Sequence, residues 1–136
     1  AALKRMGLEG PSPLALYRFI LDEVDEPWQS DTWTRRWRAL LCALAIQRDG
    51  GFDPSRPWGK ALAEAGFAES RLERLLAAQG DTQLTLALRA ARQLAAKGLA
   101  CDWRQLADLI FSTDPEIRER INTRIARDYY HNLEKD

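Results

Sequence analysis

Apolar residues recur at helical spacing along almost the whole chain, and this periodicity constrains the fold more than any other feature. The longest such stripe lies in residues 32–51 and consists of Trp33, Trp37, Leu40, Leu41 and Leu44. Its spacing of i, i+4, i+7, i+8 and i+11 places these residues on one side of a helix. Cys42 and Ile46 fall on the opposite side, so the second half of this helix is predicted to be buried all round.

The same periodicity predicts further helices. They are expected at residues 14–24, 59–66, 70–80, 81–98, 102–112 and 113–136. Residues 1–7 are expected to be the end of a helix whose start lies upstream. No segment alternates apolar and polar residues as a half-buried strand does, and no repeat is present. The sequence therefore predicts an all-α fold with short loops between antiparallel neighbours.

Glycine, proline and capping residues delimit these helices. Helix ends are expected at Gly50-Gly51, Gly66, Gly80 and Gly98. Expected starts are an N-cap at Ser30 or Asp31, capping boxes at Ser70–Glu73 and Asp102–Gln105, and Pro115 in a first turn. Residues 50–59 form the longest irregular stretch, and their prolines and glycines predict a hinge or a binding loop.

The helical stripes also predict which residues form the core. The expected inward residues are Leu14, Tyr17, Ile20, Leu21 and Val24; Leu72, Leu75 and Leu76; Leu84, Leu88, Ala91 and Ala95; and Ile117, Ile121, Ile125 and Asp128/Tyr129. A chain of 136 residues can form one domain or two small subdomains that share a core. We predict an N-terminal helical subdomain over residues 1–66, truncated at its start, and a C-terminal helical bundle over residues 67–136.

Charge restricts the possible partners without selecting one. The 20 basic and 20 acidic residues give a formal net charge of zero, which counts against an obvious nucleic-acid binder. Most of the positive charges are arginines, however, and arginine pairs bidentately with phosphate and carboxylate alike. No run is long and apolar enough for a membrane span, and no signal peptide opens the chain, so we expect a cytoplasmic protein.

The residue types that usually form catalytic or metal sites are not arranged to form one here. There is one histidine, His131, and no Ser-His-Asp or Cys-His arrangement can be built around it. Cys42 and Cys101 lie far apart without metal-like spacing, and no glycine-rich phosphate loop is present. The sequence thus predicts no catalytic residues, no metal and no cofactor.

Two groups of arginines remain to be explained. In the helix of residues 32–51, Arg35 lies opposite the apolar stripe, while Arg36 and Arg38 flank it. Both a solvated helix start and a site for an external partner fit this arrangement. In the last helix a second basic stripe consists of Arg120, Arg124, Arg127 and His131. Glu116 and Glu119 lie near it, so local salt bridges are the alternative explanation there.

Several stretches resemble a known family. They are "GKALAEAGFAESRLERLLAA", "LALRAARQLAAKGLACDWRQLADLIF", "RIARDYY" and, more loosely, "RALLCALAIQRDGG". Their order and spacing resemble the small subunit of the type I-E CRISPR surveillance complex Cascade, the CasB family, over roughly residues 33–130. The sequence departs from the family in two respects. Several relatives are more basic, and only "AALKRMG" of an N-terminal helix that usually starts with tryptophan is present.

The resemblance implies an all-α protein without catalytic activity that holds nucleic acid by its backbone. Its expected ligands are guide RNA and target or displaced DNA in the R-loop. Its expected protein partners are the Cascade backbone and large subunits and a second copy of itself. Guide pairing nearly balances the lost DNA duplex, so a protein contribution of a few kcal/mol can decide whether the R-loop persists.

The resemblance also implies three ranks of phosphate-binding residues. The first rank is Arg35, Lys60, Arg71 and Arg89; the second is Arg36, Arg38, Arg74 and Arg92; the third is Arg120, Arg124 and Arg127. The third rank matches "RIARDYY", which either packs the bundle or contacts another subunit. A helical protein–protein adaptor, whose arginines meet acidic partners without any nucleic acid, is the alternative function. Zero net charge and the many possible helix salt bridges favour that alternative.

Overall fold

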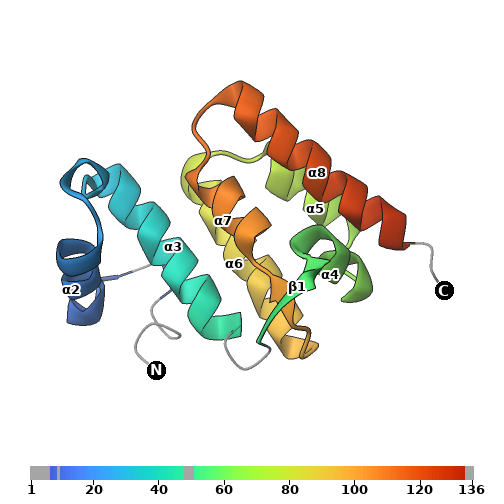
Figure 1. Ribbon diagram of the computed structural model, residues 1–136, viewed down its shortest axis with the longest axis horizontal. Coiled ribbons are helices and arrows are strands. Elements are labelled where there is room, and N and C mark those ends of the chain that lie inside the picture. Colours follow the sequence, from blue (N-terminus) through green and yellow to red (C-terminus); the bar gives the residue numbers. More distant parts are fainter. Residues whose placement is uncertain (1–6, 9, 48–50, 134–136) are drawn as a thin grey trace.

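Helices make up most of the chain, as the periodicity predicts. The structure, a computed structural model, describes residues 7–8, 10–47 and 51–133. Its helices are α2 (Leu14–Glu23), the 3₁₀ helix η1 (Glu26–Trp28), α3 (Asp31–Gln47), α4 (Trp58–Glu64), α5 (Glu69–Ala77), α6 (Gly80–Ala96), α7 (Arg104–Phe111) and α8 (Pro115–Leu133). The all-α class is confirmed (Figure 1). The helix end expected at residues 1–7 falls, except for Gly7, outside the described residues.

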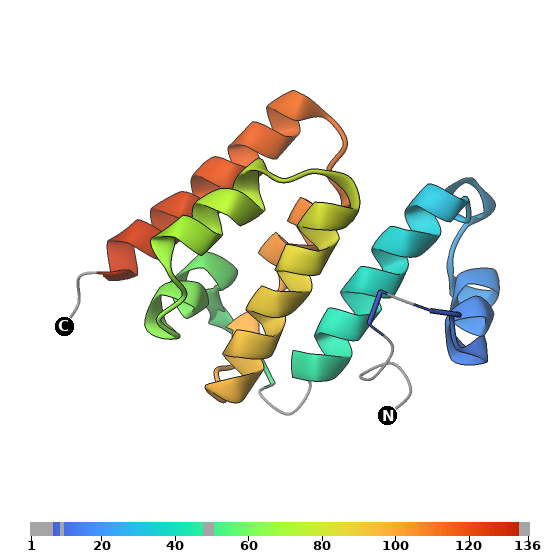
Figure 2. The same cartoon turned by 180° about the vertical axis from the view of Figure 1, so that it is seen from behind.

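Helix α6 is the central element of the packing. It contacts α3, α5 and α7, while α4 packs against α8 (Figures 1 and 2). The apolar faces of these helices form one main core, in which Trp58, Leu62, Leu94 and Ile125 are fully buried. A side chain at Gly59 would collide with the Ile125 carbonyl oxygen, so glycine allows α4 and α8 to approach closely.

Helix α2 lies at one end of the molecule and buries a different face from the predicted one. Its small core consists of Leu16, Ile20 and Val24, packed against Phe19, Trp37 and Leu41. The predictions for Leu14, Tyr17 and Leu21 are wrong, since these residues are 84 %, 49 % and 69 % exposed. The helix carries two overlapping apolar stripes that share Ile20 and Val24, and its contact with α3 decides which one is buried.

Part of the segment expected to be irregular is a strand. β1 (Phe52–Pro57) pairs in parallel with β2 (Cys101–Asp102), so the expectation of no strand is wrong at this point. Proline favours an extended backbone at the residue before it, which suits Asp53 and Arg56. Arg56 donates a hydrogen bond from Nη1 to the Ala100 carbonyl oxygen at 2.8 Å, and Phe52 packs edge-on against Trp103. These contacts hold the strand against the molecule.

Three of the helix boundaries predicted from glycine or proline are correct. Gly66 and Gly98 follow α4 and α6 with φ of 75° and 66°, and Pro115 begins α8. Gly80 begins α6 instead of ending α5. Both capping boxes are wrong, because Ala68 and Trp103 hold the N-cap positions of α5 and α7.

Gln105 has a tertiary role in place of the predicted cap. Its Oε1 accepts a hydrogen bond from the Gly59 backbone N–H at 3.0 Å, and its Nε2 donates to Asp128 Oδ2 at 2.7 Å. The side chain therefore links α4, α7 and α8. The division predicted at residues 66/67 stays a prediction, and the main core includes residues from both sides of it.

Candidate functional site

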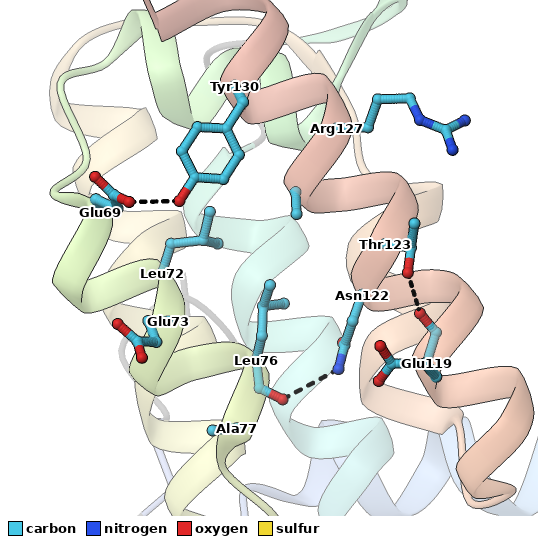
Figure 3. A pocket seen from close by; sticks show the side chains of 11 residues that line it. Glu69, Leu72, Glu73, Leu76, Ala77, Glu119, Asn122, Thr123, Arg127 and Tyr130 are labelled. Atoms are coloured by element: carbon cyan, nitrogen blue, oxygen red, sulfur yellow. Dashed lines mark hydrogen bonds between the residues drawn. The ribbon is translucent and has the colours of Figure 1, made fainter.

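Helix α5 separates its charges onto two sides. Leu72 and Leu75 are buried. At 100° per residue, Arg71 and Arg74 then lie on one flank of the helix and Glu69 and Glu73 on the other. Figure 3 shows the acidic flank, where Glu69 meets Tyr130 of α8. The arginines are therefore separated from the carboxylates of their own helix.

Helix α6 carries an exposed basic surface. Leu84, Leu88 and Leu94 belong to its buried face, while Arg89 and Arg92 are exposed. After Asp81 in the first turn, α6 contains no further acidic residue up to its end at Ala96. α5 and α6 are neighbours in the packing (Figure 2).

Four arginines of these two helices have no partner among the residues that the structure describes. We call Arg71, Arg74, Arg89 and Arg92 the α5–α6 arginines. All four are exposed. Within residues 7–8, 10–47 and 51–133, none of them forms a hydrogen bond or an ion pair. Their guanidinium groups are thus available to an external anion, which can be a phosphate or a carboxylate.

The three arginines of α3 are committed to the fold to different degrees. Arg35 is partly exposed; its Nε pairs with Asp81 Oδ1 at 2.7 Å, and its Nη1 donates to the Leu8 carbonyl oxygen at 3.3 Å. The Arg36 Nη1 donates to the Ile110 carbonyl oxygen at 2.7 Å, and its guanidinium lies 5.3 Å from the centre of the Trp33 ring.

Arg38 is buried, at 4 % exposure, and is bonded to the N-terminal segment. Its Nε donates to the Gly7 carbonyl oxygen at 2.8 Å. Its Nη1 donates to the Gly10 carbonyl oxygen at 3.1 Å and to Ser12 Oγ at 2.9 Å. Burial leaves this guanidinium no surface for a phosphate, so we remove Arg38 from the candidate contacts.

Lys60 lies apart from the α5–α6 arginines, on α4. Its Nζ is 4.0 Å from Glu64 Oε1, and the Glu64 carboxylate also pairs with Arg56 Nε at 3.1 Å. The charge of Lys60 is therefore partly neutralised within the protein.

The basic stripe of α8 lies in a surface of mixed charge. Arg120, Arg124 and Arg127 are exposed, and Glu116 and Glu119 share a shallow groove with them. The predicted local salt bridges are not seen, because no ion pair joins these groups in the described part of the chain. The nearby carboxylates still weaken the attraction of this stripe for anions.

Sequence reasoning missed Arg118, which lies between the basic stripe and the core. Its Nη2 donates to the carbonyl oxygens of Ala78 at 2.9 Å and Leu76 at 3.2 Å, at the end of α5. Burial is the main cause that lowers the pKa of Arg118, and the positive charge of Arg36 adds to it. No local pattern marks such a residue, since its acceptors lie 40 and 42 residues earlier in the chain.

The described residues offer few other reactive or metal-binding groups. Burial raises the pKa of the Cys101 thiol to about 11, so it stays protonated at neutral pH. No group of three or more His, Cys, Asp or Glu residues in that part of the chain is placed to hold a metal ion. None of the described helices has the length and apolar character needed to cross a bilayer.

Comparison with known proteins identifies a family. The family model described as CRISPR-associated protein Cse2 matches residues 1–130. Neither a search of curated proteins nor a search of solved structures found a significant match.

Proposed function

The chain belongs to the family of CRISPR-associated protein Cse2, the small subunit of the type I-E Cascade complex, and we propose that it holds nucleic acid by its backbone and stabilises the R-loop in that complex. The resemblance seen in the sequence and the family match agree on the complex. The nucleic-acid role depends on the surface of this chain.

The observation that carries the proposal is the set of four α5–α6 arginines. They are exposed, lie on two neighbouring helices and have no carboxylate partner among the described residues. An arginine that binds phosphate oxygens bidentately reads no base through that contact, as a guide-directed complex requires. Each phosphate that is neutralised also releases counterions, which adds sequence-independent affinity.

The other predicted contacts take lower ranks in this proposal. Arg35 and Lys60 share their charge with Asp81 and Glu64, so they would contribute less than an unpaired arginine. Arg36 is engaged with the end of α7. The third rank, on α8, would meet another subunit as readily as nucleic acid, because its surface has mixed charge.

The proposed setting is the cytoplasm, with contacts to guide RNA, target DNA or displaced DNA. The Cascade backbone and large subunits and a second copy of the chain are the proposed protein partners. When an R-loop forms, the free energy gained by guide pairing nearly equals the free energy lost with the DNA duplex. Four backbone contacts would therefore shift the balance without reading any sequence.

A salt-dependent binding series tests the proposal. Arg71, Arg74, Arg89 and Arg92 are all replaced by glutamine, and binding to labelled single-stranded DNA is followed by fluorescence anisotropy from low to moderate salt. The same variant is then assembled into Cascade, and the lifetime of the complex on target DNA is measured. We expect weaker binding, a flatter salt dependence and a shorter R-loop lifetime.

A matched control separates the α5–α6 arginines from total charge. Arg18, Arg120, Arg124 and Arg127 are also exposed, and replacing them with glutamine removes the same number of charges. Because the three arginines of α8 hold a lower rank in the proposal, we expect this variant to lose clearly less binding. An equal loss in both variants would refute the assignment of the site. If neither the free protein nor the assembled complex loses binding with the first variant, the adaptor function is favoured instead. In that case the protein partner should remain bound after nuclease treatment.

A further inference from the structure

A groove between α5 and α8 has an apolar floor. It has a volume of about 630 Å³, and Figure 3 shows it from close by. Leu72 and Leu76 of α5 and Ala126 of α8 line it, together with the half-exposed ring of Tyr130. This volume lies in the range of pockets that bury a small-molecule ligand, so it is sufficient for a large apolar side chain.

The groove is bordered by three carboxylates, Glu69, Glu73 and Glu119. Glu69 accepts a hydrogen bond from Tyr130 Oη at 2.5 Å. None of the three pairs with a cation among the residues that the structure describes. Arg127 is the one cation in the lining, and Figure 3 shows its guanidinium directed away from the groove. The groove is therefore negative.

These carboxylates are unfavourable for the isolated helix. Glu69 and Glu73 stand four residues apart on α5, where like charges repel and destabilise a helix. Tyr130 Oη donates a hydrogen bond to Glu69, but no cation among the described residues offsets the repulsion between the two carboxylates. A cationic partner would relieve it.

We propose that the α5–α8 groove is a docking surface for a segment of another protein subunit of the complex, one that inserts a large apolar side chain flanked by lysine or arginine. The apolar floor would accept the inserted side chain, and the three carboxylates would pair with the flanking cations. Such a segment matches the groove in both polarity and charge. A nucleic acid does not, because its phosphates would face carboxylates.

The inference deepens the proposed function by separating the two kinds of partner. α5 would present Arg71 and Arg74 to nucleic acid on one flank and Glu69 and Glu73 to protein on the other. The inference rests on membership of the Cascade complex, but it does not depend on nucleic-acid binding by the arginines. The two proposals can therefore fail separately.

The first test measures incorporation into the complex. The probe is purified, guide-loaded Cascade that lacks the small subunit, and its affinity for the small subunit is measured by biolayer interferometry without target DNA. We expect Glu73→Lys with Glu119→Lys to weaken binding at least tenfold. Binding of this variant to single-stranded DNA should not decrease, which distinguishes the result from a failure of the proposed function.

The matched control carries the same change of charge away from the groove. Glu23→Lys with Asp25→Lys alters two exposed acids near the end of α2, and we expect it to bind like the unaltered chain. Thermal melting of both variants checks that they fold. Unchanged affinity of the groove variant, or an equal loss in the control, would overturn the proposal.

Photo-crosslinking tests the identity of the occupant. A benzoylphenylalanine in place of Ala77, an exposed residue of the groove lining, is incorporated and the assembled complex is irradiated. Mass spectrometry should identify a segment of another subunit with lysine or arginine close to the crosslinked position. A crosslink to the guide RNA, to a second copy of this chain or to no macromolecule would refute the assignment.

Discussion

The start of α3 and the α5–α6 pair are both rich in arginine, but they use it in opposite ways. In α3, Arg36 and Arg38 donate to backbone carbonyl groups of distant segments. On α5 and α6, Arg71 and Arg89 have no partner in the described part of the chain. The difference lies in the surroundings, because Gly7, Gly10, Ser12 and the end of α7 accept hydrogen bonds from the arginines of α3. An arginine-rich pattern therefore indicates a binding surface only where no neighbouring segment accepts hydrogen bonds from its arginines.

The largest expected effect is a loss of stability on replacing Arg38, which serves the fold and not a ligand. Arg38→Met should lower the free energy of unfolding by about 2 kcal/mol, since carbonyl groups and a hydroxyl lose a charged donor. Urea denaturation measures the change. Arg71→Met is the control and should stay within about 0.5 kcal/mol of the unaltered protein. Equal stability of the two variants would remove the distinction between the regions.

The second effect is on binding and should leave stability almost unchanged. Replacing all four α5–α6 arginines with glutamine should reduce the slope of log K against log salt by about 3, at roughly 0.7 per phosphate contact. The affinity should fall most at low salt and approach that of the unaltered protein as the salt concentration rises. Anisotropy across the salt series measures the slope and the affinity, and circular dichroism should show an unaltered melting curve. An unchanged slope would contradict the role assigned to these arginines.

Arg36 should show a smaller effect, again on stability. Arg36→Met removes the 2.7 Å bond to the Ile110 carbonyl oxygen and the contact of the guanidinium with the Trp33 ring. Together these interactions contribute about 1 kcal/mol. Urea denaturation checks the value, and anisotropy should show unaltered affinity for single-stranded DNA. A clear loss of DNA affinity with no loss of stability would place Arg36 with the α5–α6 arginines.

The smallest expected effect is at Arg35, which stands between the two groups. Asp81→Asn removes its exposed ion-pair partner, and such pairs contribute less than about 1 kcal/mol to stability. The released guanidinium should raise affinity for single-stranded DNA about twofold, as one further phosphate contact becomes available. The same substitution in an Arg35→Gln background should have no such effect. A gain in that background would show that loss of the negative charge, and not release of Arg35, is responsible.

Local patterns predicted much of the fold correctly. Gly66 and Gly98 follow α4 and α6, and Pro115 begins α8, because each depends on the backbone preferences of one residue. The capping boxes failed at Ser70 and Asp102, because the helices begin at Glu69 and Arg104. A shift of one or two residues is enough to remove the capping box, although Asp102 Oδ1 still accepts a hydrogen bond from the Arg104 backbone N–H at 3.0 Å.

The candidate site was only partly predictable, because some of its features depend on contacts between segments that lie far apart in the sequence. The basic character of α6 is visible in the sequence, because every charged residue after Asp81 in that helix is an arginine. The separation of charge on α5 follows from the spacing of Arg71, Arg74, Glu69 and Glu73 once its buried face is known. The acidic groove was not predicted, because its lining comes from two helices that lie about 50 residues apart in the chain.

By itself, the sequence determined the helical class, most helix positions and the family. These properties depend on backbone preferences, apolar periodicity and residue type, which act over a few neighbouring positions. Tertiary structure alone decided that α2 buries Leu16 instead of Leu14, that residues 52–57 form a strand and that Arg38 is unavailable to a ligand. The reason is one of range: the acceptors of Arg36 lie 74 and 76 residues away, and only the folded chain brings them within hydrogen-bonding distance.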